Sequence, residues 1–149
     1  MKIEDEIKQQ QFKSAYQKAA INLIFTANWL LARQQEFFKP YGITTSQFNI
    51  LRILRGQYPK KISGVEIKSR MLDKNSDIPR LLDRLLKKNL ITKSVCMQDK
   101  RAADVAITQE GLQVLAQIDS QLDSIEQSTI HLSTEDATQL SNLLDRLRG

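Results

Sequence analysis

Apolar residues recur at every third or fourth position along most of the chain, and this period of about 3.6 predicts helices. The longest such stretch runs from about Glu4 to Phe38, with no Pro or Gly to interrupt it. At about 1.5 Å per residue, one helix of this length would reach roughly 50 Å. That exceeds the interior of a small domain, so we expect part of this helix to pack on something else.

Two shorter helices are predicted to follow the break at "KPYGI". Thr44 with Gln47, and Ser63 with Glu66, have the spacing of capping boxes, in which each side chain bonds to the backbone N–H near the other residue. Gly56 is expected to end the first of these helices. The connector "QYPKKI" between them has room for a very short strand at most.

A third, basic helix is predicted over "SDIPRLLDRLLKKN". Pro79 must lie in its first turn, where a missing N–H costs no helical hydrogen bond. Asp73, Asn75 and Ser76 are all candidates for its N-cap. Its apolar face consists of Ile78, Leu81, Leu82, Leu85 and Leu86.

The period then changes from 3.6 to 2, which is typical of strands. Ile91, Val95 and Met97 alternate with polar residues, and Val105 and Ile107 share one face of a second run. Two such runs joined by the short loop around Asp99 predict a β-hairpin.

Two further helices are predicted after the hairpin, capped by Thr108 and by Ser133 with Asp136. The first carries Leu115, Ile118, Leu122 and Ile125 at steps of three and four, which resembles a helix–helix contact. The last carries a leucine stripe from Leu140 to Leu147.

The charge is unevenly distributed over the 149 residues, whose formal net charge is +5. Residues 50–101 hold 14 lysines and arginines against 5 aspartates and glutamates, while the two ends are mildly acidic. A basic middle indicates one face for a polyanion, although a solvated Lys-rich surface would give the same count.

Other classes of protein find little support in the sequence. One cysteine permits no internal disulfide, and neither a signal peptide nor a membrane-length apolar run is present, which favours the cytoplasm. No nucleophile–base constellation or cofactor motif points to an enzyme. Cys96 is interpreted as a structural strand residue rather than a redox sensor, and His131 as a surface or hinge residue rather than a metal ligand.

The order helix, short helix, basic helix and ribbon is that of a winged helix-turn-helix. Its basic helix can enter the major groove of DNA, and its charged wing can reach the minor groove. In this interpretation Arg101 probes the minor groove, Lys100 contacts a phosphate, and Asp99 holds Arg101 in position. A solvated turn with an incidental ion pair is the alternative.

The stretch "PRLLDRLLKKNLITKSVCMQDKRAADVAITQEGLQVL" resembles the core of the MarR family of bacterial transcription regulators. The matching features are "RLLDRLLKKNLI", the "DKR" of the wing tip and "ITQEG". The helix-turn-helix turn departs from the family pattern, because "MLDK" has no Gly, and Asp77 and Pro79 stand where Ser or Thr is common.

The resemblance implies a mainly α fold with a small β-hairpin wing, in one domain over residues 1–149. Residues 1–40 and 109–149 would form dimerisation helices, and residues 44–108 the winged DNA-binding region. It further implies a homodimeric regulator, taken here as a repressor, on a pseudo-palindromic double-stranded DNA operator, and regulation by a small ligand or a thiol. A winged-helix module that docks proteins instead of DNA is the alternative.

The residues expected at DNA lie on the two central helices and the wing: Ser63, Gly64, Lys74, Asn75, Ser76, Asp77, Arg80, Arg84, Lys87, Asp99, Lys100 and Arg101. Within this set, Asn75 and Ser76 have helix capping as their alternative role. Asp77 is expected either to cap the helix or to accept from a cytosine amino group.

A second group of residues would line a cleft between dimer helices and winged region, which binds aromatic acids in related proteins: Phe25, Trp29, Arg33, Tyr41 and Phe48. Arg33 would pair with the carboxylate of a small aromatic or phenolic effector. The alternative is that these aromatic residues belong to the core.

Overall fold

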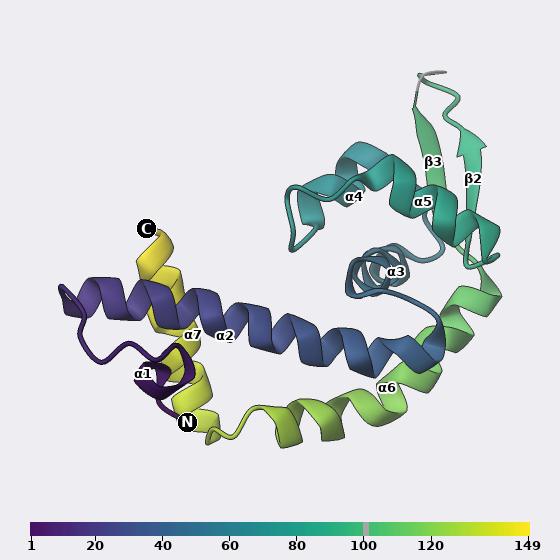
Figure 1. Cartoon of the computed structure of the whole chain (residues 1–149). Coiled ribbons are helices and arrows are strands. Elements are labelled where there is room, and N and C mark those ends of the chain that lie inside the picture. The colour runs from purple at the N-terminus through teal and green to yellow at the C-terminus, as the bar shows by residue number, and fades with distance from the viewer. Residues whose placement is uncertain (100–101) are drawn as a thin grey trace. The chain divides into compact units, whose positions relative to one another are not determined.

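The computed structural model describes residues 1–99 and 102–149, and for residues 128 and 129 the backbone alone. Its elements, of which Figure 1 labels the α-helices and the strands β2 and β3, are α1 (Ile3–Glu6), α2 (Ala15–Phe38), the 3-10 turn η1 (Lys39–Tyr41), α3 (Thr45–Gln57), β1 (Ile62–Ser63), α4 (Gly64–Arg70), α5 (Ile78–Lys87), β2 (Ile91–Val95), β3 (Ala103–Ile107), α6 (Gln109–Thr129) and α7 (Thr134–Arg148). The chain forms two compact units, Met1–Leu112 and Gln113–Gly149. The predicted mainly helical fold with a small β wing is confirmed.

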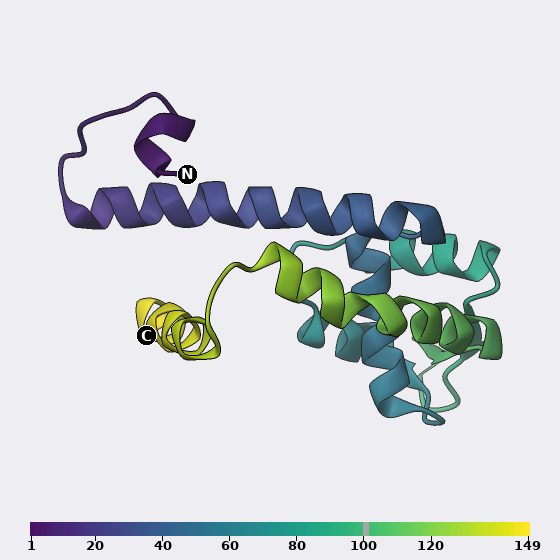
Figure 2. The same cartoon turned by 90° about the horizontal axis from the view of Figure 1, so that it is seen from below.

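The N-terminal helix is shorter than the sequence pattern predicts. Residues 7–14 separate α1 from α2, and Lys8 adopts the left-handed backbone conformation with φ of 54°. Ser14 starts α2, because its hydroxyl accepts from Gln17 N at 3.1 Å while Gln17 Oε1 accepts from Lys13 N at 2.8 Å. This reciprocal cap begins a new helix where the apolar period alone gave no boundary. Figure 2 shows the N-terminal half of α2 running beyond the winged part of the same unit.

The core of the first unit lies between α3, α4, α5 and the sheet. The capping box of Thr44 and Gln47 begins α3 as predicted, but the helix continues through Gly56 to Gln57. Helix α2 joins this core through Phe38, whose ring stacks on Phe48 with 4.3 Å between centroids. The fully buried side chains of this core include Ile50, Leu51, Leu54, Ile67, Leu85 and Val105.

The junction between α2 and α3 is tied to the end of α5 by one lysine. Lys88 donates to the carbonyl oxygen of Gly42 and, at 3.3 Å, to Oε1 of Gln47. Gln47 is only 2% exposed, and its Oε1 also accepts from Thr44 N at 3.1 Å. A buried amide oxygen is thus satisfied from two elements far apart in the sequence.

The sheet has three antiparallel strands in the order β1-β3-β2, so the short strand in the connector joins the predicted hairpin. Ile62 lies opposite Val105, and Ile91 opposite Ile107. The edge strand β2 continues into the loop that forms the tip of the wing.

Thr108 begins α6 as predicted, because its hydroxyl accepts from Gly111 N at 3.1 Å. The same hydroxyl donates to Asn89 O at 2.7 Å, which fixes the start of α6 beside the end of α5. Gly111 approaches the chain so closely that a Cβ there would lie 2.6 Å from Cγ1 of Ile107.

The second unit contains the remainder of α6 together with α7. Leu115 and Ile118 of α6 are fully buried, and Ser133 caps α7 by accepting from Asp136 N at 3.1 Å. Leu140, Leu143 and Leu147 of α7 are 46 to 61% exposed. Over the described residues, every helix is too short or too polar to cross a membrane.

Candidate nucleic-acid interface

Helix α5 presents opposite chemistry on its two faces. Asp77 is its N-cap and accepts from Arg80 N at 3.2 Å. Asp73, Asn75 and Ser76 are therefore not the N-cap, and Asp77 has the capping role that was one of its two expected roles. Pro79 lies in the first turn as predicted. Ile78, Leu82 and Leu85 are buried, and Arg80, Arg84 and Lys87 are exposed.

The turn before α5 is held by its own side chains. Asn75 N donates to Oδ1 of Asp73 at 2.9 Å, and the hydroxyl of Ser76 donates to the carbonyl oxygen of Asp73 at 2.9 Å. Ser76 is only 8% exposed, so its side chain closes the turn and offers little surface to a base. Lys74 and Asn75 are exposed. The turn, which contains no Gly, is therefore closed by two hydrogen bonds to Asp73.

Helix α4 begins with the predicted capping box, in which Ser63 accepts from Glu66 N at 3.2 Å. Ile67 faces the core, whereas Val65 on the same helix is 79% exposed. The seven residues of α4 make only about two turns, so the helix buries a narrow stripe. Phosphate binding by Ser63 and Gly64 stays a prediction.

The wing is joined to α5 by an ion pair that the sequence analysis did not predict. Lys93 Nζ lies 3.5 Å from Oδ1 of Asp83 on α5. The alternation of the strand could have indicated this ion pair, because it places Lys93 on the same face as buried Ile91, where a charged side chain needs a partner. On the outer part of the sheet, Lys61 Nζ contacts the hydroxyl of Ser94 at 3.3 Å.

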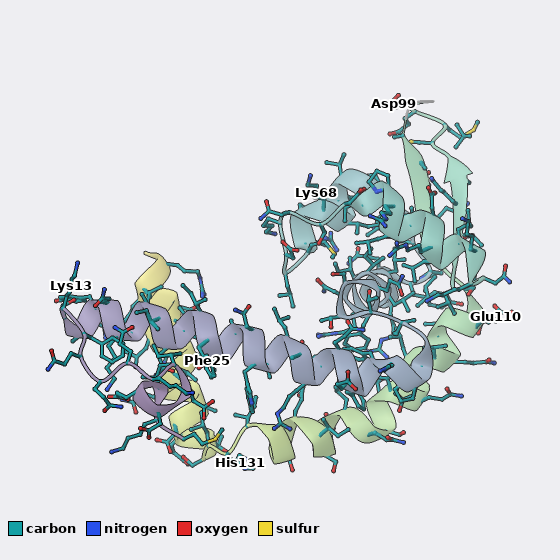
Figure 3. All side chains as sticks on the ribbon, viewed as in Figure 1. Lys13, Phe25, Lys68, Asp99, Glu110 and His131 are labelled. Carbon is teal, nitrogen blue, oxygen red and sulfur yellow. The ribbon has the colours of Figure 1, made fainter. Side chains whose placement is uncertain are left out.

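The wing tip falls partly outside the described residues. Lys100 and Arg101 belong to that part, and so do the predicted Asp99–Arg101 pair, the phosphate contact and the minor-groove probe. Asp99 itself is exposed at the outer end of the wing, as Figure 3 shows. Ala102 N donates to Asp99 O at 3.0 Å.

The charge of this surface remains positive after its ion pairs are counted. Asp83 is paired with Lys93, and Glu66 lies 4.0 Å from Arg70. Within the described part of the chain, no salt bridge joins an acid to Arg80, Arg84 or Lys87. Exposed cations on one face of a helix can neutralise the phosphates of a nucleic acid when it binds.

The five residues predicted to line an effector cleft divide into two groups. The guanidinium of Arg33 lies 4.9 Å from the Trp29 ring centroid on α2, and Phe25 on the same helix is half-buried. Phe48 instead is 7% exposed and belongs to the core. Tyr41 meets Phe37 edge-on at 5.7 Å. The effector site stays a prediction that rests on Trp29 and Arg33.

Cys96 and His131 both lie outside the helices and strands. Cys96 is half-buried directly after β2, and its N–H donates to Ala102 O at 3.1 Å. His131 is exposed between α6 and α7. The described residues contain no cluster of three or more His, Cys, Asp or Glu side chains that could hold a metal ion.

A model of the MarR family matches residues 43–103 of the chain, which run from the end of η1 to the start of β3. The chain is 36% identical over 76 residues to the HTH-type transcriptional repressor MdtR of Bacillus subtilis. That match covers 51% of this chain and 48% of the repressor, so it spans about half the length of this curated relative.

Solved structures match over nearly the whole chain. A MarR transcription factor from Planctomyces limnophilus is 28% identical with a TM-score of 0.70, and the match covers 91% of this chain and 98% of that one. A mutant of MarR from E. coli, crystallised with operator DNA, is 27% identical with a TM-score of 0.72, over 85% and 91% of the two chains.

Proposed function

The chain belongs to the MarR family of transcription regulators, and on that premise we propose that it binds double-stranded DNA sequence-specifically as a homodimer. It represses transcription from a pseudo-palindromic operator in the cytoplasm and responds to a small aromatic or phenolic effector. The family consists of regulators, not enzymes, and we extend that to this chain.

The observation that supports DNA binding most directly is the two-faced helix α5. Its buried leucines fix its orientation, so Arg80, Arg84 and Lys87 are presented to solvent together on a preformed element. A helix of this kind fits the major groove, where arginine reads guanine and lysine neutralises phosphate. Of the twelve predicted DNA contacts, we therefore place most weight on the exposed cations and on Asn75, and least on buried Ser76.

Exposed apolar side chains support the homodimer. Helix α2 leaves Tyr16, Ile24 and Leu31 at 88, 63 and 52% exposure, and α7 leaves three leucines about half exposed. Apolar surface of this kind, repeated along two helices, is typical of a protein interface. In a symmetric dimer, two α5 helices about 34 Å apart would meet successive major grooves.

The effector proposal rests on Trp29 and Arg33, whose stacked side chains combine an aromatic surface with a cation for a carboxylate. Trp29 is the single tryptophan of the chain, so its fluorescence reports on this position. Titration with salicylate should quench or shift the emission in wild type, and Arg33→Met should abolish saturation. An unchanged spectrum in wild type would count against this effector class.

The DNA-binding proposal is tested by selection from a random-sequence duplex pool, followed by affinity measurements on the selected duplex. Arg80→Ala should weaken binding by about 1–3 kcal/mol and relax sequence preference. Lys13→Ala removes an exposed cation before α2 and serves as the charge-matched control, with no expected change. If wild type enriched no sequence, the protein-docking alternative would replace this proposal.

A further inference from the structure

The face of the sheet that packs in the core continues outward along the wing. In β2, Ile91, Lys93 and Val95 share this face and lie opposite Ile107, Val105 and Ala103 of β3. Near the base, Ile91 and Val105 are 2 and 0% exposed, so the face is part of the core there. Toward the tip the helices no longer cover it, and the same register places apolar residues in solvent.

Two of these outer residues are strongly exposed. Val95 is 65% and Met97 95% exposed. Cys96 N donates to Ala102 O, so the strand pairing extends one residue past Val95, and Met97 follows directly at the outer end of the wing. A strand face that pointed only to water would carry polar residues at these positions.

The apolar surface also continues from the wing to the helices. A pocket of about 460 Å³ lies between the outer part of the wing and the first turns of α4 and α5, with Gly64, Val65, Pro79, Ala102 and Ala103 among its lining residues. Val65 is itself 79% exposed. Apolar surface thus connects the outer part of the wing with the first turns of α4 and α5.

We propose that Val95 and Met97 contact the deoxyribose walls of the minor groove beside each half-site, so that the wing binds DNA by apolar contact as well as by charge. The inference rests on the proposed function. Methionine is one of the side chains that minor-groove proteins use as apolar probes, and its flexible thioether adapts to an irregular surface. We refer to Val95 and Met97 as the wing ridge.

The surrounding charges argue for DNA as the occupant of the wing ridge. Lys93 lies on the same strand as Val95, Lys61 directly precedes β1, and Lys100 and Arg101 follow Met97 in the sequence. Sugars flanked by phosphates present an apolar surface between two rows of negative charge, which complements an apolar ridge between cations. A purely apolar protein partner would gain nothing from these four cations.

Salt dependence separates this contact from phosphate contacts. Each neutralised phosphate releases counterions, so removal of a cation lowers the slope of log K against log salt by about 1. Loss of an apolar contact lowers affinity by the same factor at every salt concentration. Met97→Gln preserves side-chain length and charge while it removes the apolar end, which makes it the appropriate variant.

The probe is a duplex that the wild-type protein has selected from a random-sequence pool. Met97→Gln should weaken its binding roughly three- to tenfold, with an unchanged salt slope. Val95→Thr should act in the same direction, and the double variant should add to it. Leu72→Gln removes a comparable apolar end at a site 83% exposed outside the ridge, and it should leave affinity and slope unchanged.

Hydroxyl-radical cleavage supplies the second readout, because it reports the exposure of individual sugars. Wild type should protect minor-groove sugars beside each half-site, and Met97→Gln should lose that protection while it keeps the protection made by α5. Matching thermal unfolding curves would establish that the variants remain folded.

The possible results are distinct. Equal affinity and equal footprints for wild type and Met97→Gln would overturn the wing ridge and leave the proposed function in place. A wild-type protein that selects no duplex would overturn both. A change in the sedimentation of Met97→Gln, without a change in its footprint, would identify the ridge as a self-association surface and also overturn the inference.

Discussion

Lys93 of β2 and Asp83 of α5 form an ion pair, with 3.5 Å between Nζ and Oδ1, that connects the wing to the basic helix. Their side chains are 34 and 62% exposed, so water competes for both charges. The pair therefore helps to orient β2 relative to α5 but contributes little to the stability of the fold.

Asp83→Asn should lower the free energy of unfolding by less than about 1 kcal/mol, because exposed ion pairs of this kind contribute little. The difference should shrink further in 1 M salt, where charges are screened. Urea unfolding of the two single variants and the double variant with Lys93→Met gives the coupling energy. A coupling above about 2 kcal/mol would show that the wing is part of the cooperative core.

Gly111→Ala should destabilise the protein by more than about 2 kcal/mol, because overpacking forces backbone to move. The new Cβ would collide with the carbonyl oxygen of Leu90 and with the side chain of Ile107. Gly56→Ala is the matched control, since a Cβ there, in the last turn of α3, meets nothing within 4 Å. It should raise stability by about 0.4–1 kcal/mol. Equal effects of the two variants on thermal unfolding would contradict the packing at the start of α6.

Asp77 allows the capping and charge roles of one side chain to be separated. Asp77→Ala should cost about 0.5–2 kcal/mol of stability, because Arg80 N loses its acceptor at the N-terminus of α5. Asp77→Asn keeps an acceptor and should leave stability nearly unchanged. It should also bind DNA more tightly, since a carboxylate beside phosphates is removed. Weaker DNA binding by Asp77→Asn with unchanged stability would instead indicate that the carboxylate accepts from a base.

Glu4 on α1 is expected to titrate below the ordinary range of a glutamate. Its hydrogen bond to the Lys18 ammonium is the largest cause that lowers its pKa. A lowered pKa in the folded state means that the stabilising contribution is present above the unfolded pKa and is lost as the pH falls through the folded pKa. An NMR titration should give a pKa for the Glu4 carboxyl below the usual value of a glutamate, and Lys18→Met should return that pKa toward the usual value.

The helix caps were the most predictable part of this fold. Thr44 with Gln47, Ser63 with Glu66, and Thr108 all act where the sequence places them, because a cap is a local bond between residues three apart. The prediction of one helix from about Glu4 to Phe38 was wrong, because a local cap begins a second helix within that stretch. Its apolar period continues through residues 7–14, and only the Ser14–Gln17 cap reveals the new start of α2.

Features that depend on tertiary contacts were less accessible from the sequence. The two-residue strand β1 exists because β3 offers it an edge, and Val65 is exposed because a two-turn helix buries only one narrow side. In the candidate site, the helical period of α5 is enough to predict its basic face. The burial of Ser76 could not be predicted, because it depends on the conformation of the turn in which Ser76 donates to Asp73.

Lys88 has a consequence for how movement passes through the first unit. Its ammonium donates to the carbonyl oxygen of Gly42, directly after η1, and to the amide oxygen of Gln47 at the start of α3, and Lys88 follows the last residue of α5 in the sequence. A tilt of α5 would remove one of the two donors to an amide oxygen that is buried from water. Movement of α5 is therefore coupled to the connection between α2 and α3.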